Sequence, residues 1–213
     1  MMQRKTVYVT GGAQGIGLGI ANELLSNGHQ VAIVDIDTEA LRAAAQRLKQ
    51  YDQLLVLEAD VSQEEHIART LERTVQHFGR LDGIVHNAGI ADPFHGTIEQ
   101  LPLETWQAYL NTNLTGAFLG MQFAARRMRT AGRGGRIIAV TSVHEHQPRV
   151  GSAAYVAAKH GVLGLVKTLA LEGADHGITA TAVCPAFVRT PLVEKQIADQ
   201  ARAHGLPEED VLK

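Results

Sequence analysis

The 213-residue sequence is poor in features that mark secreted or membrane-spanning proteins. It has one cysteine, Cys184, so no disulfide can form within the chain, and we expect a reducing, cytoplasmic setting. No apolar stretch reaches the roughly 18 residues that a transmembrane helix requires. The residues before Thr6 include no apolar segment, so no signal peptide is expected.

The sequence also has no large excess of positive or of negative residues. The chain has 20 Lys and Arg against 22 Asp and Glu, which gives a formal net charge of -2. This balance removes the simplest argument for a nucleic-acid partner or an anionic membrane surface. A hydrophobic share of 45% is ordinary for a globular protein. We therefore expect a single domain over residues 1–213, with a small molecule as its partner.

Short β-rich runs alternate with longer helical patterns along the chain. Strands are expected at 5–10, 30–35, 54–58, 83–86, 136–141 and 179–184. Helices are expected between these strands: at 15–27, starting at 37, starting at 62, at 102–129 and at 153–174. A last helix is expected after the sixth strand, at 193–204. Ser62 and Glu65 have the spacing of a capping box. Repeated strand–helix units require crossover connections and predict a doubly wound, mostly parallel α/β sheet in three layers.

A glycine-rich turn joins the first strand to the first helix. Its glycines let the backbone approach a pyrophosphate, and the helix N-terminus behind them offers free N–H groups. Asp35 ends the second strand about 20 residues further on, where its carboxylate can bind an adenosine ribose and repel a 2′-phosphate. The pattern predicts NAD as cofactor. The residues expected to contact it here are Gly11, Gln14, Gly15, Ile16, Gly17 and Asp35.

Tyr155 and Lys159 lie four residues apart in an expected helix and so share one face. A phenol titrates near 10 in water, so a tyrosine base at neutral pH requires a lowered pKa. Lowering it by ~3 units takes about 4 kcal/mol, which a nearby ammonium and a hydrogen bond can supply. A structural tyrosine beside a solvated lysine is the alternative reading, and the otherwise apolar helix argues against it.

In order and spacing, these motifs resemble the short-chain dehydrogenase/reductase family over nearly the whole chain, which implies a Rossmann-type fold. Asp60-Val61 resembles the family's adenine-contacting pair, and Asn87-Ala88-Gly89 matches its Asn-Ala-Gly motif, with His86 where asparagine is common. Pro185 to Thr190 resembles the loop that grips the nicotinamide. The resemblance places Asp60, Val61, Asn87, Ala88, Gly89, Tyr155, Lys159, Pro185, Val188 and Thr190 at the cofactor.

The resemblance implies hydride transfer between NAD(H) and a secondary alcohol or ketone. Ser142 would orient the substrate oxygen, Tyr155 would take the alcohol proton, and Lys159 would lower the tyrosine pKa and hold the nicotinamide ribose. Asn113 matches the family's active-site asparagine, which implies that it positions a water linking Lys159 to solvent.

Two segments, 154–162 and 188–197, resemble 3-hydroxybutyrate dehydrogenases of this family. In that branch the residues matching His144 and Gln196 help to hold the substrate carboxylate, beside Ser142 and Tyr155. The branch's lysine and its first glutamine are replaced here by Ser152 and Ala91. A small hydroxy acid is therefore one expectation. A sugar or polyol is another, because Ser142 to Glu145 resembles sugar dehydrogenases.

Other readings remain open. A truncated, non-catalytic NAD-binding protein would keep the glycine turn, and a Rossmann-like methyltransferase would leave Tyr155 and Lys159 without a role. No metal is expected, because His144-Glu145-His146 lacks a third ligand in the sequence and Cys184 reads as a buried strand end. The apolar helix 153–171 and the resemblance predict a homodimer or homotetramer. The family's seventh strand is expected to be absent.

Overall fold

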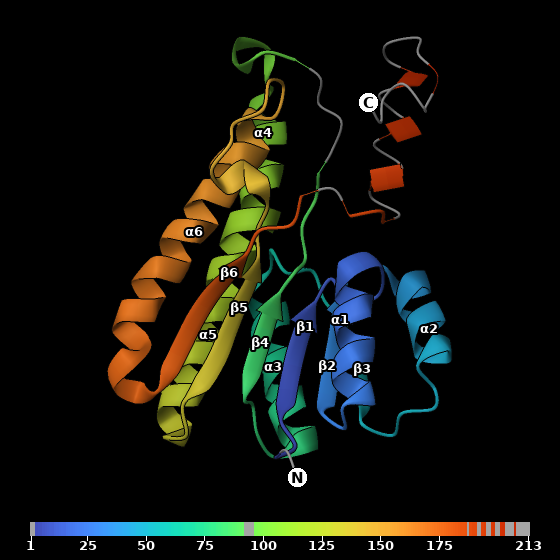
Figure 1. Cartoon of the computed structure of the whole chain (residues 1–213), viewed down its shortest axis with the longest axis vertical. Coiled ribbons are helices and arrows are strands. Elements are labelled where there is room, and N and C mark those ends of the chain that lie inside the picture. Colours follow the sequence, from blue (N-terminus) through green and yellow to red (C-terminus); the bar gives the residue numbers. More distant parts are fainter. Residues whose placement is uncertain are drawn as a thin grey trace.

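A computed structural model describes residues 3–91, 96–186, 188–190, 193–194, 197–198, 201–202 and 207. Six strands form one sheet in the order β3-β2-β1-β4-β5-β6, and every neighbouring pair is parallel (Figure 1). The strands are β1 (Thr6–Thr10), β2 (Gln30–Asp35), β3 (Leu54–Glu58), β4 (Gly83–His86), β5 (Gly135–Val140) and β6 (Ile178–Val183). The predicted parallel sheet is confirmed, with strand ends within one residue of those expected.

Alternate residues of the central strand point into two separate cores. Val7 and Val9 of β1 pack against α1 (Gly15–Ser26) and α2 (Thr38–Arg47). Tyr8 joins the opposite core. That core is completed by α3 (Glu64–Phe78), α5 (Gly116–Ala131) and α6 (Ala153–Gly173). Because a parallel strand covered on both faces buries every side chain, β1 is an unbroken buried run. The layers are helix, sheet and helix, as predicted.

The helix expected over 102–129 is interrupted. It consists of α4 (Leu103–Tyr109), a π-helical turn η2 (Leu110–Thr115) and α5. The buried Asn113 lies in this turn, and its side chain forms hydrogen bonds with both the amide and the carbonyl of Ile90. Such π-turns are frequent at functional sites. Of the helix expected over 193–204, only the pairs 193–194, 197–198 and 201–202 are described, and they are helical.

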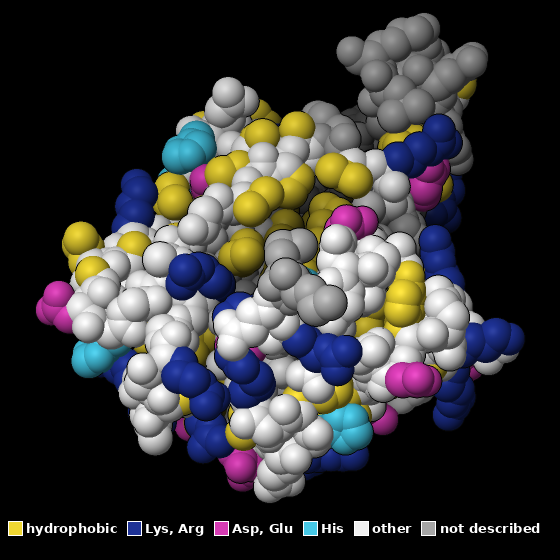
Figure 2. Space-filling model, turned by 60° about the horizontal axis from the view of Figure 1, so that its bottom comes forward, with side chains coloured by type: hydrophobic (Ala, Val, Ile, Leu, Met, Phe, Trp, Pro, Cys, Tyr) yellow, Lys and Arg dark blue, Asp and Glu magenta, His cyan; other side chains and the backbone are white. Residues whose placement is uncertain are grey.

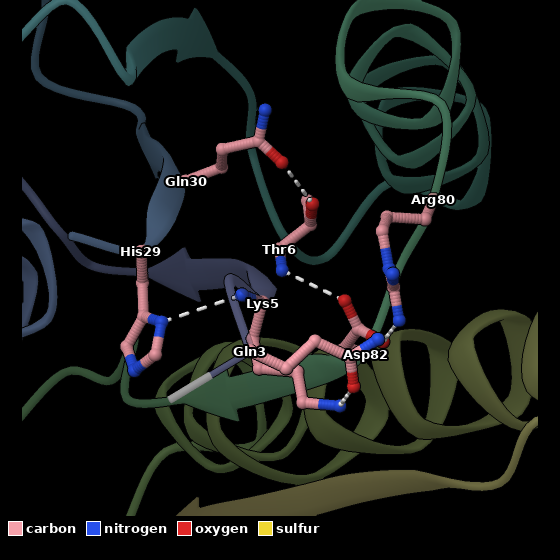
Figure 3. A network of polar contacts seen from close by, with 7 residues as sticks. All are labelled: Gln3, Lys5, Thr6, His29, Gln30, Arg80 and Asp82. Carbon is pink, nitrogen blue, oxygen red and sulfur yellow. Dashed lines mark hydrogen bonds and ion pairs between the residues drawn. The ribbon is translucent and has the colours of Figure 1, made fainter. Parts of the chain in front are cut away.

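Hydrogen bonds and an ion pair connect the N-terminal ends of three neighbouring strands (Figure 3). Asp82, just before β4, accepts a hydrogen bond from the Thr6 amide at 2.9 Å and contacts Arg80 at 2.5 Å. The Thr6 hydroxyl donates to Gln30 at 2.9 Å. These contacts align β4, β1 and β2, whose opposite ends carry the residues predicted to bind the cofactor.

None of the described helices is both long and apolar enough to cross a bilayer. On the face shown in Figure 2, Lys and Arg side chains are dispersed, with Asp and Glu between them. This agrees with the near-neutral composition.

Candidate active site

A cavity of about 460 Å³ opens at the carboxyl ends of the strands, between β1 and β4. The order of the strands reverses there, since β1 has β2 on one side and β4 on the other. In open parallel sheets, ligands bind at this switch point. The wall includes these predicted residues: Gly11, Gln14, Gly15, Ile16, Asp35, Asp60, Val61, Asn87, Ala88, Gly89, Ser142, His144, Tyr155, Lys159, Pro185, Val188 and Thr190.

The glycine turn is held too tightly for larger residues. A Cβ atom at Gly17 would lie 2.1 Å from the Gly11 carbonyl oxygen, so Gly17 supports the turn from behind and is not part of the cavity wall. Gly15 has a φ of +54°, which glycine adopts at no steric cost. Its α carbon faces Thr190, since a Cβ there would lie 3.4 Å from that side chain. The glycine turn and Thr190 therefore lie close together at the cavity wall.

Two carboxylates mark the end of the cavity beside β2 and β3. Asp35 accepts hydrogen bonds from the Ala13 amide at 3.2 Å and from the Asp37 amide at 3.2 Å. Asp60 accepts bonds from the amide and the hydroxyl of Ser62, at 2.9 and 2.7 Å. Ser62 is therefore committed to Asp60, and α3 begins after Gln63 without a side-chain cap, so the predicted capping box is wrong.

The Asn-Ala-Gly segment is fastened to the glycine turn. The Asn87 side-chain amide donates to the carbonyl oxygens of Thr10 and Gly11, at 3.1 and 3.0 Å. The Thr10 hydroxyl accepts bonds from the Asn87 and Ala88 amides, both at 3.0 Å. Behind them, burial and the nearby Lys159 charge lower the pKa of His86 to about 3, so its imidazole is neutral.

Asn113 lies behind the cavity wall and is fully buried. Its side-chain oxygen accepts from the Ile90 amide at 2.8 Å, and its nitrogen donates to the Ile90 carbonyl at 2.9 Å. A Cβ at Gly89 would lie 2.9 Å from that oxygen and 3.8 Å from the Lys159 ammonium nitrogen. Asn113 therefore holds the 89–90 segment close to Lys159, with both polar atoms of its side chain engaged.

Ser142 and Tyr155 meet at the other end of the cavity. Ser142 follows β5, and Tyr155 lies in the first turn of α6. Burial raises the pKa of the Tyr155 phenol above its usual 10, and a hydrogen bond with Ser142 works in the opposite direction. In the chain without its cofactor, burial therefore outweighs the hydrogen bond, and the lowered pKa expected from the sequence also depends on the positive nicotinamide ring.

Lys159 lies one helical turn after Tyr155 in α6, and its ammonium nitrogen is 5.5 Å from the centre of the tyrosine ring. The nitrogen donates a hydrogen bond to the Val140 carbonyl at 3.2 Å. Burial lowers the pKa of Lys159 to about 8, and the negative charge of Glu145 opposes that shift. At neutral pH the lysine is thus mostly protonated.

Tyr109, Arg149 and the burial of Glu145 were not expected from the sequence. Tyr109 lines the cavity, and its ring centre is 6.5 Å from that of Tyr155. Arg149 also lines the cavity. Glu145 is buried near Lys159. Gln196 lies outside the described residues.

The fold and the site define a nicotinamide dinucleotide-dependent oxidoreductase that acts on CH–OH groups. A model of the short chain dehydrogenase family matches residues 5–201, and the chain belongs to this family. Its glycine turn, Asn-Ala-Gly segment and Ser142–Tyr155–Lys159 group occupy one cavity, as the sequence resemblance predicts.

Relatives and solved structures agree with this assignment. The chain is 38% identical over 211 residues to a D-beta-hydroxybutyrate dehydrogenase of Rhizobium meliloti, covering 98% of this chain and 81% of the relative. It is 37% identical to 3beta-hydroxysteroid dehydrogenase 2 of Eggerthella lenta, covering 87% and 72%. Levodione reductase superposes with a TM-score of 0.87 at 31% identity, covering 92% of this chain and 77% of that one.

Proposed function

We propose that this protein oxidises a small secondary hydroxy acid, such as 3-hydroxybutyrate, with NAD. The observation that carries the proposal is that Ser142, Tyr155 and Lys159 converge in the same cavity as the glycine turn. Tyr155 accepts the hydroxyl proton as the carbinol hydrogen leaves with its electron pair, and the product is a ketone. Ser142 holds the substrate oxygen beside the phenol.

The cofactor fits this chain's own residues. Gly11, Gly15 and the N-terminus of α1 offer backbone N–H groups to a pyrophosphate, and Asp35 stands where an adenosine ribose would lie. Lys159 would hold the nicotinamide ribose. When bound, the oxidised nicotinamide supplies the hydride acceptor and a positive charge near the phenol. That charge, with the Lys159 ammonium, favours the phenolate that burial alone opposes.

The Asp35 carboxylate at the end of β2 is expected to select NAD over NADP. Replacement by serine removes the negative charge that would face a 2′-phosphate, because like charges in contact cost several kcal/mol. We expect D35S to lower the ratio of kcat/KM for NAD to that for NADP by about 100-fold. Steady-state rates with both cofactors measure it. Asp52→Ser, at an exposed position outside the cavity, should leave the ratio unchanged.

The cavity has one charged side chain suited to a substrate carboxylate. The ring nitrogen Nδ1 of His144 lies 2.9 Å from the Gln147 carbonyl, which can only accept, so Nδ1 carries the hydrogen. In this tautomer Nε2 can only accept a hydrogen bond. Lys159 is buried and bound to Val140. Arg149 is therefore the remaining cation among the described wall residues.

Replacing Arg149 with alanine is expected to raise KM for 3-hydroxybutyrate by about 10- to 100-fold, the value of one charge-assisted hydrogen bond. KM for an uncharged secondary alcohol should stay the same, because it has no carboxylate to lose. Arg73→Ala, on the exposed side of α3, controls for net charge. An equal loss for both substrates would argue against a carboxylate contact.

A panel of secondary alcohols with NAD tests the proposed function as a whole. Reduced cofactor should form fastest, by absorbance, with a hydroxy acid. The named relatives do not favour the sugar or polyol alternative or the non-catalytic one. Oxidation of sugars alone would overturn the proposed substrate, and no oxidation of any alcohol by folded, NAD-binding protein would overturn the proposed function.

We also propose that the chain acts as one catalytic domain in a cytoplasmic homodimer or homotetramer. The single sheet supports this, since it carries both the dinucleotide end and the tyrosine end of the cavity. Exposed apolar side chains on the outer helices support an assembly: Leu171 of α6 is 82% exposed and Phe118 of α5 is 42% exposed. A single cysteine suits the cytoplasm.

A further inference from the structure

Three metal-ligating side chains come together beside the serine loop, outside the cavity wall. Glu145 ends the short 3-10 helix η3 (Val143–Glu145), His146 follows it, and Cys184 follows β6. One Glu145 carboxylate oxygen, Oε1, lies 2.5 Å from Cys184 Sγ and 3.1 Å from His146 Nε2. One potential ligand atom from each residue lies within 4.8 Å of the others. The third ligand that the sequence did not reveal is thus supplied by the residue after β6, 39 positions further along the chain.

The burial of these groups suits an ion that enters from solvent. The Glu145 side chain is 1% exposed, whereas that of His146 is 63% exposed, and Cys184 is exposed rather than buried as expected. The second carboxylate oxygen, Oε2, is buried and has no hydrogen-bond partner among the described residues. A buried polar atom without a partner is costly and calls for a physical reason. Lys159 provides a positive charge nearby but donates its hydrogen bond to Val140, so an ion bound to this carboxylate would supply the missing partner.

We propose that Glu145, His146 and Cys184 bind a divalent transition-metal ion of the Zn²⁺ type, with water in the fourth position. Carboxylate oxygen, imidazole nitrogen and thiolate sulfur are the three ligand classes of zinc, and the sulfur disfavours Mg²⁺ and Ca²⁺. On binding, Cys184 loses its thiol proton to solvent, and the S–H···O bond to Glu145 gives way to metal–sulfur and metal–oxygen bonds. One proton is released per ion, and nothing is oxidised or reduced.

The site would join two segments that border the active-site cavity. Glu145 lies three residues after Ser142, and Cys184 immediately precedes Pro185. The Val143 amide already donates to the Pro185 carbonyl at 3.1 Å. An ion held by Glu145 and Cys184 would add a second connection beside this bond. The proposal does not depend on the proposed substrate or cofactor.

Cobalt titration of the reduced, chelator-treated full chain tests this proposal. Because Cys184 is the only cysteine, a sulfur-to-cobalt charge-transfer band can come from no other residue. We expect this band, with the visible bands of four-coordinate Co²⁺, to saturate at one ion per chain and to disappear when Zn²⁺ is added. Proton release, followed with a pH indicator in weak buffer, should saturate at the same ratio.

Two exposed ligands allow variants that should still fold, which far-ultraviolet circular dichroism can check. C184S should lose the charge-transfer band, and C184S and H146A should each bind Co²⁺ at least about 10-fold more weakly. His176→Ala, at an exposed histidine that ends the short 3-10 helix Ala174–His176, is the control and should bind as the unmodified chain does. Cobalt bound without the sulfur band, or bound equally well by C184S, would overturn the proposal, as would no binding.

Discussion

Phenylalanine in place of Tyr155 is expected to lower kcat by about a thousandfold while NAD still binds. The substitution removes the hydroxyl that takes the substrate proton, and general-base catalysis contributes about this factor. The ring is retained, and with it the edge-on contacts to Tyr109 and His144, at 6.5 and 6.2 Å between ring centres. Initial rates by absorbance measure the first effect, and calorimetric titration with NAD measures the second.

Tyr109 provides a matched control for this experiment, because it is a second phenol in the same cavity. Y109F should stay within about tenfold of the unmodified enzyme, since it removes no proton acceptor from the reacting oxygen. If Y155F also remained within tenfold, Tyr155 would not be the base.

Methionine in place of Lys159 should reduce kcat/KM by about 100-fold or more near neutral pH. The variant keeps an unbranched side chain that is one atom shorter and removes the charge. Without that charge the Tyr155 pKa rises further, so the activity of the variant should increase with pH over a range in which the unmodified enzyme is already active. In the unmodified protein Lys159, with its pKa lowered to about 8, is protonated below that pH and loses its proton above it. A pH series of initial rates measures the difference.

Lys167, exposed on the same helix, provides the comparison for this variant. K167M should match the unmodified enzyme in rate and pH profile. Thermal melts of both variants establish that the rates refer to folded protein, since K159M leaves the buried Glu145 without an opposing charge. A K159M profile that coincided with that of the unmodified enzyme would contradict the role given to Lys159.

Most of the fold was predictable because its signals are local. Apolar runs such as 30–35 identify strands covered on both faces, and their alternation with helical patterns determines a parallel sheet. The exceptions depend on tertiary contacts. Ser62 was expected to cap a helix but binds Asp60, and the π-turn around Asn113 depends on Ile90, 23 residues earlier.

The site residues divide in the same way, into those with a local sequence signal and those whose position depends on tertiary contacts. The glycine turn and the spacing of Tyr155 and Lys159 are local, and the structure brings both to one cavity. Glu145 was not predicted, because an acid in a loop is usually solvated. Its burial and its contact with Cys184 arise only when β5 and β6 pair. The sequence was enough to predict that β5 and β6 lie in one parallel sheet. It was not enough to predict that Glu145 contacts Cys184.

Isotope transfer tests the central claim most directly. The protein is supplied with NAD and with 3-hydroxybutyrate that carries deuterium on the carbinol carbon, and the reduced cofactor is analysed by mass spectrometry. If Ser142, Tyr155 and Lys159 support hydride transfer, each reduced cofactor should contain one deuterium, and Y155F should yield almost none in the same time. Reduced cofactor without deuterium, or none from folded, NAD-binding protein with this or any other secondary alcohol, would contradict the account.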